Sequence, residues 1–67
     1  HFKEVETLPD LVDVLRNDPR PDIRSTAAWA IGQIKDEKAQ LALYEASERE
    51  QDAVVKKEIQ LALSNRE

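Results

Sequence analysis

The feature that most constrains the fold of this 67-residue chain is an internal repeat with a period of 32 residues. Each half carries apolar side chains at the spacing of one helix face, i, i+3, i+4 and i+7. A helical hairpin that recurs at this period is typical of an α-solenoid, in which stacked helix pairs share one core. The matching positions are Leu11 with Leu43, Ile23 with Val55, Arg24 with Lys56, Ala30 with Ala62, and Ile31 with Leu63. The match is weakest at Ser47 and Ser64, which stand where the first half has Leu15 and Gly32.

The two halves predict an all-α fold, an α-solenoid fragment of two helical hairpins with four helices in total. Thr7 and Asp10 fit a cap at the start of the first helix, with Pro9 in its first turn. The second helix should start near Pro21, and Asp36 and Asp52 should cap the third and fourth. The expected inward stripes are Leu8, Leu11, Val12 and Leu15; Ile23, Ala27, Ala30, Ile31 and Ile34; Ala39, Ala42, Leu43 and Ala46; and Val55, Ile59, Ala62 and Leu63.

A domain division follows from these stripes. Residues 7–64 are expected to form one repeat domain, with 7–35 as the first helix pair and 36–64 as the second. The chain starts with His1 rather than methionine, so residues 1–6 are interpreted as a tag remnant or lead-in. Residues 65–67 are interpreted as a tail.

Composition excludes several kinds of chemistry. The chain has no cysteine and one histidine, His1, so it has no thiolate metal site and no Ser-His-Asp set. One glycine cannot make a glycine-rich phosphate loop. The acid run Glu45, Glu48, Glu50 and Asp52 is interpreted as a solvated face. We therefore expect no catalytic residue, no metal and no cofactor in this chain. No apolar run is long enough for a membrane span, and the absence of cysteine is consistent with the cytoplasm.

Three arginines could form one edge of the first hairpin. Arg16 ends the first helix, Arg20 lies in the loop, and Arg24 lies in the first turn of the second helix. One interpretation is internal pairing, for example of Arg24 with Glu50 or Asp52. The other is a phosphate-contacting edge, since the guanidinium fork binds two oxygens at once. The net charge of −4 argues against strong binding of nucleic acid by the chain alone.

The stretch from Ile23 to Ile34 combines the only tryptophan and the only glycine of the chain with three alanines. The small side chains indicate close approach of neighbouring helices. Trp29 lies off the inward stripe, and Leu61 is its counterpart 32 residues later. Either Trp29 and Leu61 are shielded where one flank packs on the adjacent repeat, or they form an interface with a partner or with the rest of a longer protein.

The stretch "LPDLVDVLRNDPRPDIRSTAAWAIGQIKDEKA" resembles a HEAT-like repeat of the kind found in phycobilisome lyases and in many bacterial and archaeal proteins. The resemblance covers residues 7–64 and implies an interaction module. More narrowly, "NDPRPDIRSTAAWAIGQI" and "VVKKEIQLAL" are similar to the C-terminal HEAT-like part of bacterial epoxyqueuosine reductases. That resemblance implies a parent enzyme with a 4Fe-4S cluster and cobalamin that acts on tRNA in queuosine synthesis.

Two functions follow as expectations. In the first, the chain is a non-catalytic C-terminal module of an epoxyqueuosine-reductase-like, cytoplasmic bacterial enzyme and helps bind tRNA or brace the catalytic domain. Its partners are then the remainder of the parent protein and tRNA, with no membrane. In the second, it is a protein–protein scaffold module from a longer HEAT-repeat or phycobilin-lyase-like protein.

Overall fold

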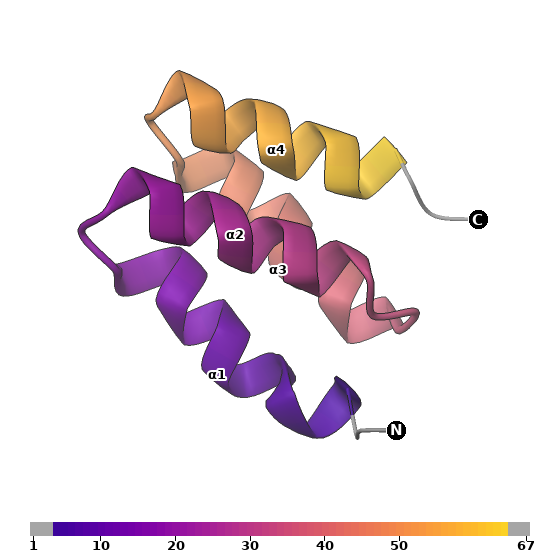
Figure 1. Ribbon diagram of the computed structural model, residues 1–67. Helices are drawn as coiled ribbons and strands as arrows, with labels where there is room; N and C mark the ends of the chain where they lie inside the picture. Colours follow the sequence, from indigo (N-terminus) through magenta and orange to yellow (C-terminus); the bar gives the residue numbers. More distant parts are fainter. Residues whose placement is uncertain (1–3, 65–67) are drawn as a thin grey trace.

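A computed structural model describes residues 4–64 and consists there of four α-helices without a strand (Figure 1). The helices are α1 (Glu4–Asn17), α2 (Pro21–Gly32), α3 (Glu37–Arg49) and α4 (Ala53–Ser64). The expected all-α fold of two helical hairpins is confirmed. The prediction that α1 starts at Thr7 is wrong, because α1 begins at Glu4 and contains Pro9 in its interior. The interpretations of residues 1–3 and 65–67 lie outside the described residues.

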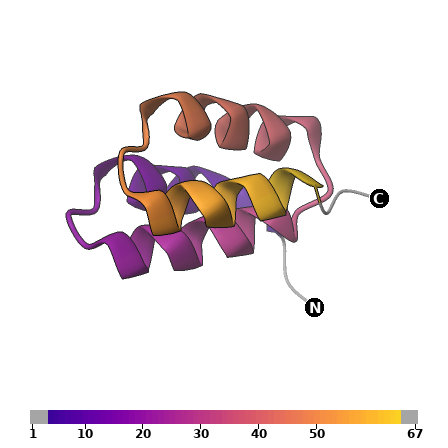
Figure 2. The same cartoon turned by 90° about the horizontal axis from the view of Figure 1, so that it is seen from above.

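The four helices form two layers. Figures 1 and 2 show α2 and α4 side by side in one layer, with α1 and α3 behind them. Helix α2 packs against all three other helices, and α3 also packs against α1 and α4. The α1–α2 and α3–α4 loops lie at the same end of the molecule (Figure 2). The stack therefore brings together, at one end, the residues that precede α2 and the residues that precede α4.

One apolar core runs through both helix pairs. Its largest fully buried side chains are Ile31, Val55 and Ile59, none of which exposes any surface. Every predicted stripe contributes to it, although Leu11, Val12, Ile23, Ala30, Ala42 and Leu63 are only partly buried. The buried residues are Leu8, Leu15, Ala27, Ala28, Ile31, Ile34, Ala39, Leu43, Ala46, Val55, Ile59 and Ala62.

The helix starts follow from local chemistry. The Asp36 carboxylate accepts a hydrogen bond from the Lys38 backbone N–H at 2.8 Å. The Asp52 carboxylate accepts from the backbone N–H groups of Val54 and Val55, at 2.9 and 3.1 Å. Both predicted caps are confirmed, and each satisfies donors that a helix start leaves unpaired. Helix α2 instead begins with Pro21, whose missing N–H costs nothing at that position.

The glycine of α2 lies where the two pairs meet. Gly32 is the last residue of α2, and a Cβ atom placed on it would lie 2.8 Å from the Cβ of Ala62 in α4. Real Cβ atoms do not approach so closely, so this crossing requires a residue without a side chain. The expectation that small residues permit close helix packing is confirmed at this point.

Candidate functional site

The three predicted arginines lie at the end of the molecule that holds the α1–α2 and α3–α4 loops, but their surroundings differ. Arg24 is a structural residue. Its Nε donates to Glu50 Oε1 at 3.1 Å and one terminal nitrogen, Nη2, donates to Glu50 Oε2 at 2.9 Å. The other terminal nitrogen donates to the Asp18 backbone carbonyl at 2.7 Å. The internal pairing predicted for Arg24 is therefore confirmed, and its fork is not available to a phosphate.

The pair of Arg24 and Glu50 is largely shielded, with 17% and 6% of their side-chain surfaces exposed. Burial by itself raises the pKa of Glu50. The hydrogen bonds from Arg24 and from the Asp52 backbone N–H outweigh that effect, so the pKa of Glu50 lies below its ordinary value. Glu50 therefore stays ionised and fastens the α3–α4 loop to the start of α2.

Arg20 forms a local pair within its own loop. Its Nε and a terminal nitrogen donate to the two Asp18 carboxylate oxygens at 3.1 and 3.0 Å, and its backbone N–H donates to the same carboxylate at 2.9 Å. These bonds lower the pKa of Asp18. The Arg20 side chain remains 67% exposed. A surface pair of this kind leaves the guanidinium accessible, so Arg20 can still meet a second anion.

Arg16 shares a hollow with an arginine that the sequence analysis did not identify. The hollow has a volume of about 350 Å³ and lies between the ends of α1 and α3 and the start of α2. Among the described residues, neither Arg16 nor Arg49 forms an ion pair. Each occupies the last turn of its helix, and this position is the sequence signal that could have identified Arg49. The residues that line the hollow are Leu15, Arg16, Arg24, Ala46, Arg49, Glu50 and Gln51.

Trp29 and Leu61 lie on the outer surface of α2 and α4. Trp29 is 56% exposed and Leu61 is 54% exposed, which excludes the alternative in which the adjacent repeat shields them. They are nevertheless neighbours, because both line one small hollow together with Gly32, Gln33, Glu58 and Ala62. The physical reason is the close crossing of α2 and α4 at Gly32 and Ala62, which leaves the larger side chains on either side of the seam rather than in it.

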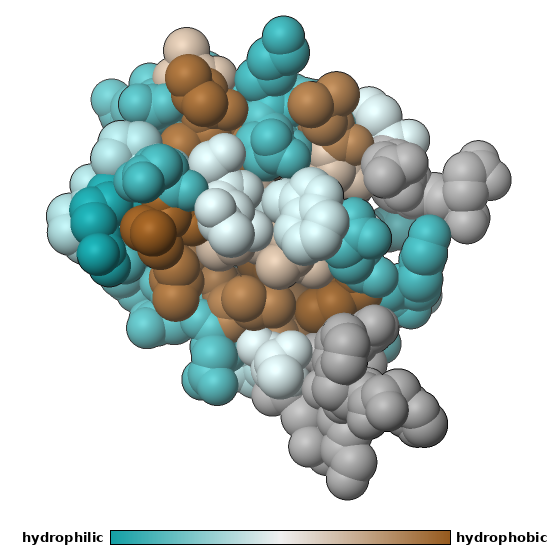
Figure 3. Space-filling model, viewed as in Figure 1, coloured by the Kyte–Doolittle hydropathy of each residue, from teal (hydrophilic) through white to brown (hydrophobic). Residues whose placement is uncertain are grey.

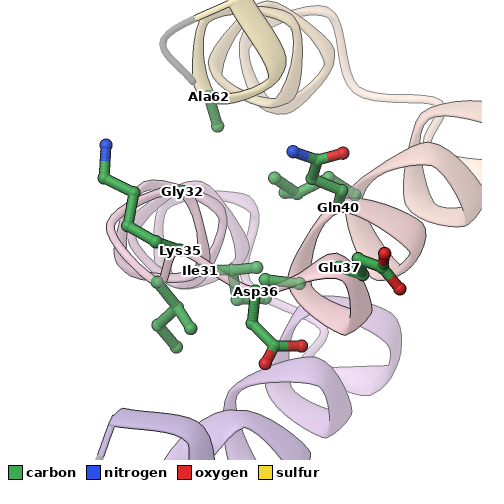
Figure 4. A pocket seen from close by; sticks show the side chains of 10 residues that line it. Ile31, Gly32, Lys35, Asp36, Glu37, Gln40 and Ala62 are labelled. Carbon is green, nitrogen blue, oxygen red and sulfur yellow. The ribbon is translucent and has the colours of Figure 1, made fainter. Parts of the chain in front are cut away.

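A wider hollow lies at the opposite end of α2 and was not predicted. It has a volume of about 600 Å³, and its floor is apolar, with Ile31, Ile34 and Leu43. Figure 4 shows Ala62 of α4 opposite Gly32 of α2, Gln40 and Glu37 on α3, and the side chain of Lys35, which follows α2, pointing away from Gln40. The rim mixes both signs of charge, with Lys35 beside Asp36 and Glu37. Nothing there matches the arrangement of an acid, a base or a nucleophile.

Residues 4–64 contain neither a metal-ligating cluster nor a membrane-spanning helix. This part of the chain holds no group of three or more histidine, cysteine, aspartate or glutamate residues suited to a metal ion. None of its helices combines the length and the apolar character that a membrane crossing requires.

Comparison with known proteins gives one family and a consistent set of relatives. The family model for HEAT repeats matches residues 1–64. The chain is 46% identical to an epoxyqueuosine reductase of Bacillus cereus over 94% of its own length and 17% of that protein. It is 48% identical to the epoxyqueuosine reductase of Bacillus subtilis, over 90% of the chain and 16% of the enzyme. An uncharacterised protein of Geobacillus stearothermophilus, encoded in the region 3′ of gldA, is 51% identical over 88% of the chain and 27% of that protein.

These relatives are much longer than the chain, which spans about a sixth of the two reductases. No solved structure matches the chain significantly. The matched segment is homologous to a part of epoxyqueuosine reductases, and that segment is a HEAT repeat.

Proposed function

Because the chain belongs to the HEAT repeat family, we propose that it is a non-catalytic HEAT repeat module of an epoxyqueuosine-reductase-like, tRNA-modifying enzyme of the cytoplasm. One observation carries the proposal: the identity to proteins named epoxyqueuosine reductase is 46% and 48% over nine-tenths or more of the chain. In such a parent the module is the C-terminal part. Its partners are the remainder of the parent protein and tRNA.

Catalysis belongs to other parts of this proposed parent. The 4Fe-4S cluster implied by the resemblance needs thiolate ligands, and the chain has no cysteine. The described residues also lack a cluster of metal-ligating side chains, so we assign neither the iron–sulfur cluster nor cobalamin to this chain.

The role that we propose for the module is local contact with tRNA phosphates. The contacts are Arg16 and Arg49 in their shared hollow and the exposed Arg20 beside it. Arg24, which the sequence pattern placed among the phosphate contacts, instead holds the loop that positions them. Phosphate contacts of this kind position an RNA without reading its sequence. The net charge of −4 limits the module to a few such contacts.

The test is tRNA binding by the full-length parent with Arg16→Gln and Arg49→Gln together. We expect weaker binding and a salt dependence whose slope falls by about one for each lost contact. A matched control is Lys35→Gln with Lys38→Gln, which changes the net charge equally. These two exposed lysines lie at the opposite end of α2 and at the start of α3, and their replacement should leave the slope unchanged. Equal slopes in both variants would overturn the RNA role and leave the bracing role.

A second candidate function is a protein–protein scaffold, favoured by the exposed Trp29 and Leu61. Tryptophan is enriched among the residues that dominate protein interfaces. A Trp29→Ser variant of the parent that keeps tRNA binding but separates from a protein partner would favour this function over the first.

A further inference from the structure

Four apolar positions on one side of the first helix pair are less buried than their counterparts 32 residues later. Leu11, Val14, Ile23 and Ala30 are only partly buried. All four counterparts are buried in the core. The pairs of equivalent positions are Leu11 with Leu43, Val14 with Ala46, Ile23 with Val55, and Ala30 with Ala62.

The difference has a simple origin. The two helix pairs have the same architecture, so equivalent side chains point in equivalent directions. The second pair has the first pair on this side, as the contact of Ala62 with Gly32 shows. The first pair has no described neighbour on the same side. We call the surface formed by Leu11, Val14, Ile23 and Ala30 the leading flank. Figure 3 shows apolar surface along the boundary of α1 and α2, on the side of α2 away from α4.

The opposite flank of the stack, on the outer side of the second helix pair, is polar rather than apolar. Three buried positions of the first pair, and Gly32 at its crossing with α4, have polar counterparts in the second pair. The exchanges along the repeat are Leu8 to Gln40, Leu15 to Ser47, Ala28 to Gln60, and Gly32 to Ser64. We call Gln40, Ser47, Gln60 and Ser64 the trailing flank. A polar outer surface is what a terminal repeat of a solenoid requires, and the leading flank lacks it.

We propose that the leading flank is an interface for one further helical hairpin of the same kind, stacked on α1 and α2 as they are stacked on α3 and α4. Two observations select this occupant. The flank repeats, position by position, a surface that the chain already uses to bind a hairpin. The chain also spans only about a sixth of the reductases it matches, which leaves ample length for another repeat. This inference rests on the repeat alone and holds whether or not the module contacts tRNA.

The existing interface fixes the chemistry of the incoming hairpin. Ala62 accepts only a residue without a side chain at its crossing point, and Ala30 is its counterpart, so the incoming second helix carries glycine there. Glu50 receives Arg24 from the preceding pair, and its counterpart is Asp18. A basic side chain at the start of the incoming helix therefore meets the Asp18 carboxylate, which Arg20 already holds in place.

The test uses the chain's own hairpin as the probe. One protein carries a second copy of residues 5–36 fused directly before residue 5. The control carries a second copy of residues 33–64 fused directly after Ser64, so both additions keep the 32-residue period. We expect the first addition to raise the midpoint of thermal unfolding by on the order of 10 °C, because it covers the leading flank. The second addition should raise it much less, because it meets the polar trailing flank.

An Ile23→Lys variant locates the effect. Placed in the original copy, it should abolish the gain in melting temperature of the extended protein. It should change the melting temperature of the 67-residue chain little, because Ile23 is only partly buried there. Trp29→Lys, on the same helix but off the flank, should leave the gain intact. Equal gains from the two additions, or no gain from the first, would overturn the proposal. So would a dimer of the 67-residue chain that Ile23→Lys dissociates in sedimentation, since the flank would then bind a second copy.

Discussion

Gly32 of α2 and Ala62 of α4 meet so closely that a methyl group on Gly32 would lie 2.8 Å from the Ala62 Cβ and 3.3 Å from its Cα. The obstacle is a Cβ next to backbone rather than the end of a flexible side chain, so only movement of a whole helix can relieve it. The absence of a side chain at Gly32 therefore sets how closely the two hairpins pack.

Gly32→Ala should destabilise the chain by about 1–2 kcal/mol. Replacing a helical glycine by alanine ordinarily stabilises a helix by up to about 1 kcal/mol. Here the added methyl group overpacks the crossing, which costs about 1–3 kcal/mol. Urea unfolding followed by circular dichroism measures the difference. The double variant Gly32→Ala with Ala62→Gly should recover part of the loss, and a single variant more stable than the parent would show that α2 and α4 have room to spare.

Ile31→Ala should cost about 2–5 kcal/mol, the range for truncation of a large buried aliphatic side chain. Ile31 exposes no surface and is one of the largest side chains in a core with many alanines. The matched control is Leu63→Ala at the equivalent position of the second pair, where the side chain is only partly buried. The loss there should be clearly smaller. Equal losses in the two variants would contradict the deeper burial of Ile31.

Most of the fold could be predicted from the sequence because the same pattern of apolar residues and helix caps occurs in both halves of the chain. The stripes containing Ile31 and Ile59 and the caps at Asp36 and Asp52 are all local patterns with a known spacing. The start of α1 was missed because Pro9 was interpreted as a first-turn proline, whereas the helix tolerates it in its interior.

The candidate site was less predictable, because it depends on contacts across the stack. The pairing of Arg24 with Glu50 joins residues 26 positions apart, and the sequence offered Asp52 equally well. The exposure of Trp29 depends on how close α2 and α4 approach, which the helical phase of one residue does not reveal. Arg49 entered the site only when the ends of α1 and α3 were placed side by side.

The pair of Arg24 and Glu50 should make the stability depend on pH in the acid range. The folded pKa of Glu50 lies below its ordinary value of 4.5, so the contribution of the ionised Glu50 to stability is complete above pH 4.5. The contribution is lost as the pH falls from 4.5 through the lower folded pKa. Glu50→Gln should lower the midpoint of thermal unfolding at pH 7 and flatten the part of the pH dependence that falls in this window. Thermal melts between pH 2 and 7 make the comparison.

Glu48→Gln is the control for that experiment, because Glu48 is an exposed acid in the same run and removes the same charge. Its pH profile should follow that of the parent chain. Identical profiles for the Glu50 and Glu48 variants would mean that the shielded pair does not contribute to the acid sensitivity.

The fluorescence of Trp29 should report a largely open side chain. It is the only tryptophan, it is 56% exposed, and it lines two small hollows, of about 50 and 210 Å³. Acrylamide, which is neutral, should therefore quench it strongly. Iodide should quench it less, because Glu58 lines both hollows beside the indole and repels an anion. Glu58→Gln should raise the iodide quenching constant and leave the acrylamide constant unchanged, with N-acetyltryptophanamide as the reference for full access. Weak quenching by both agents would mean that something covers Trp29 in solution, and a constant that falls with protein concentration would identify a second copy as the cover.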